Sequence, residues 1–294
     1  MLAADLRPDG LDDALAGLDA LELPAARPQS RLRALWRSAW PKLAALSLGI
    51  GLWQVVVWSG WKPEYALPGP AAVSSTLWEM LADGTIATAV GTTMQRAAVG
   101  FALAGVIGVV VGSLVARVRP LRDAVGSLIT GVQTMPSIAW FPLAILLFQL
   151  SEQAILFVVV MGAAPAIANG LITGADHIPP ILLRAGRTLG ARGLTAYRHV
   201  ILPASLPAFV GGLKQGWAFA WRSLMAGELI VVIAGKPSVG FLLQVNRELA
   251  NAEGLIATMI VILVIGIAVD SLLFGTLDRA IRRRWGLVET SDTS

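Results

Sequence analysis

Residues 154–175 read AILFVVVMGAAPAIANGLITGA and contain no charged side chain. A helix that crosses the roughly 30 Å hydrocarbon core of a bilayer needs about 20 predominantly apolar residues. This stretch is long enough and apolar enough to meet that requirement. It therefore predicts a transmembrane helix. The other apolar stretches of the chain predict how many further helices cross the membrane.

Five further apolar stretches of comparable length occur along the chain. The one at 123–149 is interrupted by Pro136 and Pro142, so this crossing is expected to be kinked or broken, because proline removes a backbone donor. Together the six stretches predict an all-α, polytopic membrane protein with six transmembrane helices. The five are residues 43–60, 90–116, 123–149, 205–234 and 255–277.

The composition agrees with a chain that lies in lipid. Of its 294 residues, 55% are hydrophobic and 14% are charged, against roughly 45–50% and about 25% in soluble domains. We therefore attribute the net charge of +4 to cationic loops beside a membrane and expect no nucleic-acid partner. The absence of cysteine excludes disulfides and thiolate metal sites, and the two histidines argue against a self-contained metalloenzyme.

The positions of lysine and arginine predict the orientation and the tails. With the N-terminus in the cytoplasm, 17 of the 23 basic residues lie before the first crossing, in inward loops or after the last crossing, and three lie in outward loops. Since an excess of Lys and Arg marks the cytoplasmic side, both termini are predicted to be cytoplasmic. We expect a polar tail at 1–41, without the early apolar core of a signal peptide, a transmembrane domain at 42–285 and a C-terminal tail at 286–294.

Small residues recur at the four-residue spacing that lets helices approach closely. We interpret these pairs as packing within the helix bundle in preference to a dedicated dimer face. The pairs are Gly108 with Gly112, Gly170 with Gly174, and Gly212 with Gly216.

The hydrophilic segment 176–204 is far longer than a simple inner loop requires. Apolar residues recur in it at three- or four-residue spacing, which indicates helix. Gly190 interrupts the pattern and Ile201-Leu202-Pro203 ends it. We expect two short helices parallel to the membrane that meet at Gly190 and form a surface for a cytosolic partner. The alternative is a solvated amphipathic loop.

The stretch LLRAGRTLGARGLTAYRHVILPASLPAFVGGLK at 182–214 resembles the EAA loop of permease subunits of binding-protein-dependent ABC importers. Ala185 and Gly186 stand at the two alanines of that motif and Gly190 at its glycine, whereas Arg184 stands where the family usually has Glu. Two other segments, ALPGPAAVSSTLWEML at 66–81 and QTMPSIAWFPLAILLF at 133–148, are similar to the sulfonate, nitrate and taurine branch of that family.

This resemblance implies a type I ABC importer permease fold in a bacterial inner membrane, with a coupling loop at about 176–207. It also implies the partners: a second permease copy in a homodimer, two cytosolic ATPase subunits that carry ATP and Mg, and an extracytoplasmic substrate-binding protein. The resemblance implies that the Glu of the motif contacts the ATPase, so with Arg184 at this position that particular contact is not expected to carry over. The residues expected to couple to the ATPase are Arg184, Ala185, Gly186, Leu189, Gly190 and Ala191.

The chain itself shows no enzyme chemistry. It lacks the G-x-x-x-x-G-K-[ST] loop that cradles nucleotide phosphates, so ATP is expected on another chain. Neither histidine is placed for a nucleophile and base pair, since both lie in the coupling segment. We therefore expect no enzymatic activity and no cofactor bound by this chain.

Irregular backbone at membrane depth is tolerated where it is buried in protein or lines a water-filled cavity. We therefore expect the break at Pro136 to line the translocation pathway, although a simple kink is the alternative. Glu228 is expected either to pair with Arg222 or to lie at an outer gate. The pathway candidates are Gln133, Thr134, Ser137, Trp140, Arg222 and Glu228.

The resemblance implies a small anionic solute such as an aliphatic sulfonate, taurine or nitrate, and the guanidinium fork of Arg222 would suit such an oxyanion. Bicarbonate and thiamine-precursor pyrimidines are also carried by members of the family. An ion-coupled secondary transporter is the alternative function, but it needs acids inside the membrane and usually inverted repeats. Only Glu228 and Asp270 are available. An integral-membrane enzyme, a third possibility, lacks a catalytic cluster.

Overall fold

A computed structural model describes residues 31–284 of the chain, and these residues are helical almost throughout, with no strand among them. The prediction of a C-terminal tail lies outside the described residues, and so does most of the predicted N-terminal tail. The described chain divides into two compact units, with the boundary between Val56 and Val57. The helix α2 (Arg31–Trp58) belongs almost entirely to the first unit, and the other helices belong to the second.

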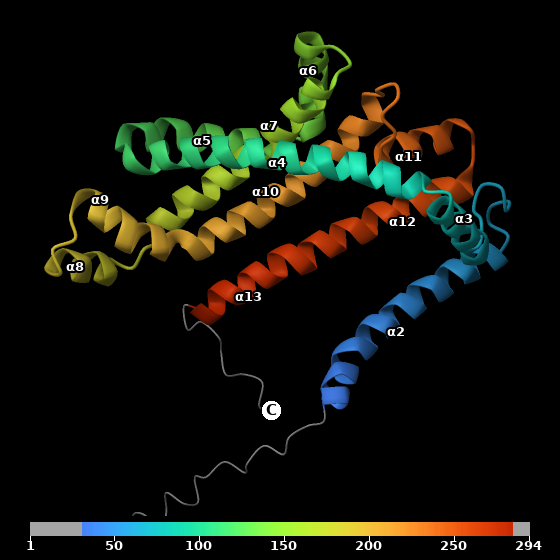
Figure 1. Ribbon diagram of the computed structural model, residues 1–294, viewed down its shortest axis with the longest axis horizontal. Helices are drawn as coiled ribbons and strands as arrows, with labels where there is room; N and C mark the ends of the chain where they lie inside the picture. The colour runs from blue at the N-terminus through green and yellow to red at the C-terminus, as the bar shows by residue number, and fades with distance from the viewer. Residues whose placement is uncertain (1–30, 285–294) are drawn as a thin grey trace, which may run out of the picture. The chain divides into compact units, whose positions relative to one another are not determined.

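Figure 1 shows the helices of the second unit in chain order. Their order is α3 (Pro70–Ala82), α4 (Thr85–Arg117), α5 (Arg119–Thr134), a 3-10 turn (Ser137–Trp140), α6 (Phe141–Phe148), α7 (Glu152–Asp176), α8 (Pro180–Thr188), α9 (Gly193–Ala196), a π-helical turn (Tyr197–Ile201), α10 (Leu202–Ile230), α11 (Val239–Glu248), α12 (Ala252–Ala268), a second π-helical turn (Val269–Phe274) and α13 (Gly275–Arg284).

Four described helices are long and apolar enough to cross a membrane: Ala39–Trp58, Thr85–Arg117, Glu152–Asp176 and Ala252–Ile281. A fifth crossing results if the pair Pro120–Thr134 and Ser137–Phe148, bent by 100°, counts as one broken span. The polytopic all-helical fold is thus confirmed, whereas the count of six is not. The remaining predicted crossing coincides with the 29-residue helix α10, but its three charged residues reduce its apolar character. They are Lys214, Arg222 and Glu228.

The break between α5 and α6 has a local cause. Met135, which precedes Pro136, has the extended backbone angles φ −68° and ψ 132°. The ring of a following proline disfavours the helical conformation at such a residue. The helix therefore ends at Thr134, and a short 3-10 turn begins at Ser137. The expected interruption at Pro136 is confirmed by this geometry.

The core of the second unit is built around α7. In the most apolar 18 residues of α7, 56% of the residues are buried. The same share is 28% in α4 and 11% in the span that begins with α12. Helix α7 packs along α10 on one side and α4 on another. Figure 1 shows the paired helices α7 and α10, with α8 and α9 at one end of the pair and α11 at the other.

Glycine allows α7 and α10 to touch through their backbones. A Cβ atom added at Gly170 would lie 2.5 Å from the Cα atom of Gly212, and one added at Gly212 would lie 2.7 Å from the Cα atom of Gly170. Real Cβ atoms do not approach other atoms this closely. The interpretation of the small residues as packing within the bundle is therefore confirmed for Gly170 and Gly212, which come from two of the three predicted pairs.

Candidate functional site

A hollow of about 360 Å³ opens beside the break in the third predicted crossing. Its walls come from the end of α5, the 3-10 turn, α7 and α10. Five of the six pathway candidates line it, although they are far apart in the sequence. These are Gln133, Thr134, Ser137, Trp140 and Arg222.

Arg222 is the one charged side chain among the residues that line this hollow. It is exposed, and its guanidinium carbon lies 5.6 Å from the centroid of the Phe219 ring. A cation over an aromatic face at an exposed site gains roughly 0.5–1 kcal/mol. Within residues 31–284 no acidic side chain forms an ion pair with Arg222. Its charge is therefore available to a ligand in the hollow.

Glu228, the sixth candidate, lies elsewhere and does not pair with Arg222. Its side chain is completely buried, and its Oε1 accepts a hydrogen bond of 3.0 Å from Nη1 of Arg96 in α4. The backbone N–H of Gly240 donates to Oε2 at 3.0 Å, and the Thr93 hydroxyl donates to the same oxygen at 2.9 Å. The expected pair with Arg222 is wrong, and Glu228 does not line the hollow. Its alternative place at an outer gate stays a prediction.

The Glu228 carboxylate lies at the N-terminus of α11, where free backbone N–H groups favour an anion. Thr93 also accepts a hydrogen bond of 2.9 Å from the backbone N–H of Val239, the first residue of that helix. The side chain of Ser238 caps the same end by accepting from the backbone N–H of Phe241. These contacts anchor α11 to α4 and α10.

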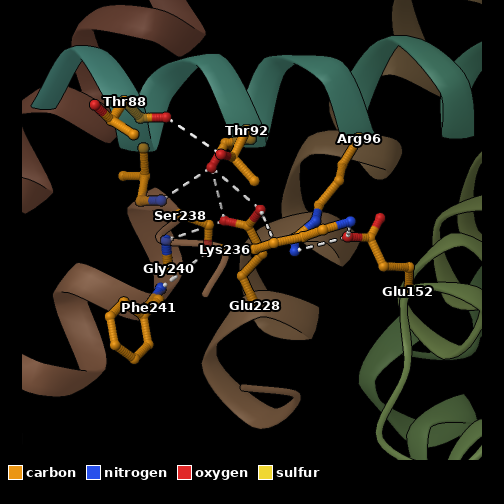
Figure 2. A network of polar contacts seen from close by, with 11 residues as sticks. Thr88, Thr92, Arg96, Glu152, Glu228, Lys236, Ser238, Gly240 and Phe241 are labelled. Carbon is orange, nitrogen blue, oxygen red and sulfur yellow. Dashed lines mark hydrogen bonds and ion pairs between the residues drawn. The ribbon is translucent and has the colours of Figure 1, made fainter. Parts of the chain in front are cut away.

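A second acid extends the cluster to α7 (Figure 2). Nη2 of Arg96 donates to Oε1 of Glu152 at 3.2 Å, and Nζ of Lys236 contacts the same oxygen at 2.8 Å. Arg96 is only 5% exposed, so it is a buried cation held between two carboxylates. The signal in the sequence was an arginine inside the stretch 90–116, since such residues usually pair with something. The partners themselves could not be identified from spacing.

The predicted coupling segment consists of α8, α9 and the π-helical turn Tyr197–Ile201. Gly190 lies between α8 and α9 with φ +83°, a conformation that glycine adopts without the steric cost of a Cβ atom. The backbone N–H of Ala191 donates to the carbonyl of Gly186 at 2.9 Å and closes the turn. The expected arrangement of two helical segments that meet at Gly190 is confirmed.

The six predicted coupling residues have different surroundings. Arg184, Ala185, Leu189 and Gly190 are exposed, and Leu189 is 87% exposed. Gly186 is buried, and a Cβ atom added there would lie 2.8 Å from Cγ2 of Val200. This close approach accounts for glycine where the family motif has alanine.

The remaining coupling candidate, Ala191, lies in a hollow between the two arms of the coupling segment. Its volume is about 390 Å³, and its lining also includes Gly186, Arg187, Arg192 and Val200. The turn at Gly190 therefore leaves an open space behind the exposed face of α8.

Residues 104–284 match the model of a family described as the binding-protein-dependent transport system inner membrane component. The chain belongs to this family. It is a permease component of a binding-protein-dependent ABC importer, and the resemblance seen in the sequence is confirmed.

Curated relatives of the permease differ in the solutes that their names mention. It is 28% identical to the riboflavin transport system permease protein RibX of Chloroflexus aurantiacus, over 89% of this chain and 97% of that one. It is 27% identical to the putative aliphatic sulfonates transport permease protein SsuC of Escherichia coli, over 75% and 83%. It is 26% identical to the nitrate import permease protein NrtB of Synechococcus elongatus, over 71% and 80%.

A solved structure supports the fold. The permease is similar to a chain of the MetNI methionine ABC transporter in inward-facing conformations, with a TM-score of 0.56 and 22% sequence identity. The match covers 66% of this permease and 94% of that chain. At this level of identity the likeness concerns the fold, which is that of a type I ABC importer permease.

Proposed function

We propose that the permease works as a homodimer whose two copies enclose the pathway of a small anion. An extracytoplasmic binding protein delivers the solute, and two cytosolic ATPase subunits, which hold ATP and Mg, supply the energy. The permease itself catalyses no reaction and binds no cofactor. Both of its termini face the cytoplasm.

The observation that carries the proposal is the unpaired Arg222 in the hollow at the broken crossing. An arginine near the middle of a membrane helix costs roughly 2.5–3.5 kcal/mol on insertion scales, and such residues mark substrate pathways. The buried Arg96 is neutralised by Glu228 and Glu152, so its charge has a structural explanation. Arg222 has no such explanation within the described chain.

The chemistry of the hollow favours an oxyanion as the solute. A guanidinium donates two parallel hydrogen bonds to a pair of oxygens, as in a sulfonate or nitrate. The hydroxyl of Ser137 and the amide of Gln133 line the same hollow and add hydrogen-bond donors, whereas the Thr134 hydroxyl already donates to the carbonyl of Gly131 at 2.7 Å. The names of the sulfonate and nitrate relatives agree with this class of solute. The name of the riboflavin relative indicates a different solute, so the test below includes riboflavin.

The coupling role is supported by the exposed face of α8. Ile181, Leu182 and Leu189 are 66%, 44% and 87% exposed, and they lie beside the motif residues Arg184 and Ala185. Apolar side chains exposed together at such a site indicate a binding surface. We assign this surface to the ATPase.

An ion-coupled transporter is disfavoured by the state of the two candidate acids. Glu228 is held by Arg96, and Oδ1 of Asp270 lies 3.1 Å from Nζ of Lys214. Both acids here are engaged in ion pairs, whereas the unpaired charge in the hollow is a cation.

The proposal is tested by purifying the permease in mild detergent together with the proteins encoded beside it. We expect an ATPase to co-purify, and ATP hydrolysis to rise when the binding protein loaded with its solute is added. Calorimetry on the binding protein with a sulfonate, taurine, nitrate and riboflavin then identifies the solute. Purification without any ATPase, or hydrolysis that ignores the binding protein, would contradict the proposal.

A further inference from the structure

The coupling segment carries a one-sided charge. Residues 177–201 contain four arginines and two histidines, and neither Asp nor Glu. The nearest acid in the sequence, Asp176, is already engaged, because its Oδ1 lies 2.6 Å from Nη2 of Arg122. No ion pair within residues 31–284 neutralises the four arginines. They are Arg184, Arg187, Arg192 and Arg198, and all four are exposed.

The basic charge borders an apolar stripe on α8. Ile181, Ala185 and Leu189 recur every four residues and are exposed, so they form one stripe along the helix. Arg184 lies at the edge of this stripe. The opposite side of α8 is covered, since Gly186 is buried against Val200. The free face of α8 is therefore apolar along its middle and cationic along its edge.

This face suits a protein groove better than a lipid surface. Membrane-surface helices bind in proportion to the apolar area that they bury. The stripe offers only two large apolar side chains, Ile181 and Leu189, beside the small Ala185, and the nine-residue helix is followed by a tight turn at Gly190. A groove that fits the helix can add shape complementarity and paired charges to this small apolar area.

We propose that the ATPase of this importer presents an acidic groove to α8, with carboxylates facing Arg184. In this contact the permease would supply the cation and the ATPase the anion. In family members whose motif has Glu at the position of Arg184, the permease supplies the anion at this position. Because like charges facing each other at an interface strongly suppress wrong pairings, this permease would select its own ATPase and reject those that pair with a Glu-type loop. The inference rests on the proposed coupling function and specifies the partner's surface.

The test uses the full-length permease in nanodiscs and titrates its separately purified ATPase onto it. The variant Arg184→Glu, which restores the usual residue of the motif, is expected to lower the affinity at least about tenfold, and Arg184→Gln less. Raising the salt from about 0.1 M to about 0.5 M should weaken binding of the unmodified permease, since salt screens exposed charges. The matched control is Arg247→Glu, because Arg247 is an exposed arginine in α11, outside the coupling segment.

Equal or tighter binding of the ATPase to Arg184→Glu would overturn the proposal, and so would binding of the unmodified permease that does not weaken with salt. The salt titration decides the matter even if the variant fails to insert. If Arg184→Glu lowers the affinity for the ATPase in phosphatidylglycerol nanodiscs but not in phosphatidylcholine nanodiscs, the basic face binds lipid headgroups instead. If the effect of Arg184→Glu on the affinity for the ATPase vanishes when the six acids before residue 23 are replaced by Asn and Gln, the basic face binds the chain's own N-terminal stretch instead.

The two proposals fail in different ways. If the unmodified permease binds no ATPase at any salt concentration, the proposed coupling function is wrong. If it binds the ATPase and the affinity ignores both salt and the charge at residue 184, only the acidic groove is wrong.

Discussion

Arg222 and Glu228 are charged residues of the same helix, and the structure gives them opposite surroundings. Six residues along an α-helix correspond to a rotation of about 240° from one face to another, or 120° measured the shorter way. Glu228 therefore turns into the contact with α4, where Arg96 meets it, while Arg222 turns toward the hollow at the broken crossing. The separation explains why one charge is structural and the other is available to a solute.

At Arg222 we predict that removing the charge abolishes most transport. Arg222→Gln is expected to lower uptake of the anion roughly tenfold to a hundredfold, because a hydrogen bond to a charged group is worth about 1.5–3 kcal/mol. Arg222→Lys should recover part of the uptake, since it restores the charge without the two-pronged fork. Uptake into proteoliposomes is the measurement, and the amount of co-purified ATPase reports on assembly. Normal uptake by Arg222→Gln would remove the anion role.

At Arg96 we predict a loss of stability. Arg96→Met leaves the buried Glu228 without its cation, and breaking a buried ion pair in this way costs roughly 3–5 kcal/mol. The double variant Arg96→Met/Glu228→Gln should recover part of that loss, because no unpaired charge is then buried. Thermal unfolding of the purified permease measures both variants.

The control for the Arg96 experiment is Lys236→Gln. Lys236 contacts the same Glu152 but is 57% exposed, and an exposed ion pair contributes about 1 kcal/mol or less. If Arg96→Met were as stable as Lys236→Gln, the buried cluster would not be holding the helices together.

At the scale of the helices, neighbouring glycines of α10 offer a matched pair. A Cβ atom at Gly212 would collide with Gly170 of α7, whereas one at Gly211 meets nothing within 4 Å. We expect Gly212→Ala to destabilise the permease by roughly 1–3 kcal/mol through overpacking, and Gly211→Ala to have little effect. Thermal unfolding distinguishes them, and equal melting temperatures would refute the backbone contact between α7 and α10.

The turn at Gly190 makes a separate prediction. Valine is strained at φ +83°, whereas Asn tolerates this region better. No atom lies within 4 Å of an added Cβ, so any effect must come from backbone strain. We expect Gly190→Val to insert normally but to lose uptake and stimulated ATP hydrolysis, and Gly190→Asn to keep most of both. If both variants lose coupling equally, the positive φ is not what the turn requires.

Local sequence patterns predicted the features that depend only on residues near one another in the chain. The apolar stretches located the helices, Pro136 located the break, and Gly190 located the turn of the coupling segment. The pairing of Glu228 with Arg96 could not be predicted in this way, because the two residues are 132 positions apart and meet only when α4 and α10 pack. The same packing explains why Gly186, an exception to the family motif, fits against Val200.

At the scale of the whole molecule, the orientation in the membrane is open to a direct test. The chain contains no cysteine, so single cysteines can be introduced at the exposed residues Thr195 and Leu249. In intact cells an impermeant thiol reagent should label Leu249→Cys and spare Thr195→Cys until the membrane is opened. The reverse pattern would invert the predicted orientation.

The central claim is that the permease moves its solute with energy from ATP hydrolysed by a partner. The most direct measurement is uptake of labelled solute into proteoliposomes that contain the permease and its ATPase, with the binding protein outside and ATP inside. We predict uptake that needs both ATP and the binding protein and continues after ionophores have collapsed all ion gradients. Uptake that proceeds without ATP and stops when the ion gradients collapse would contradict the account.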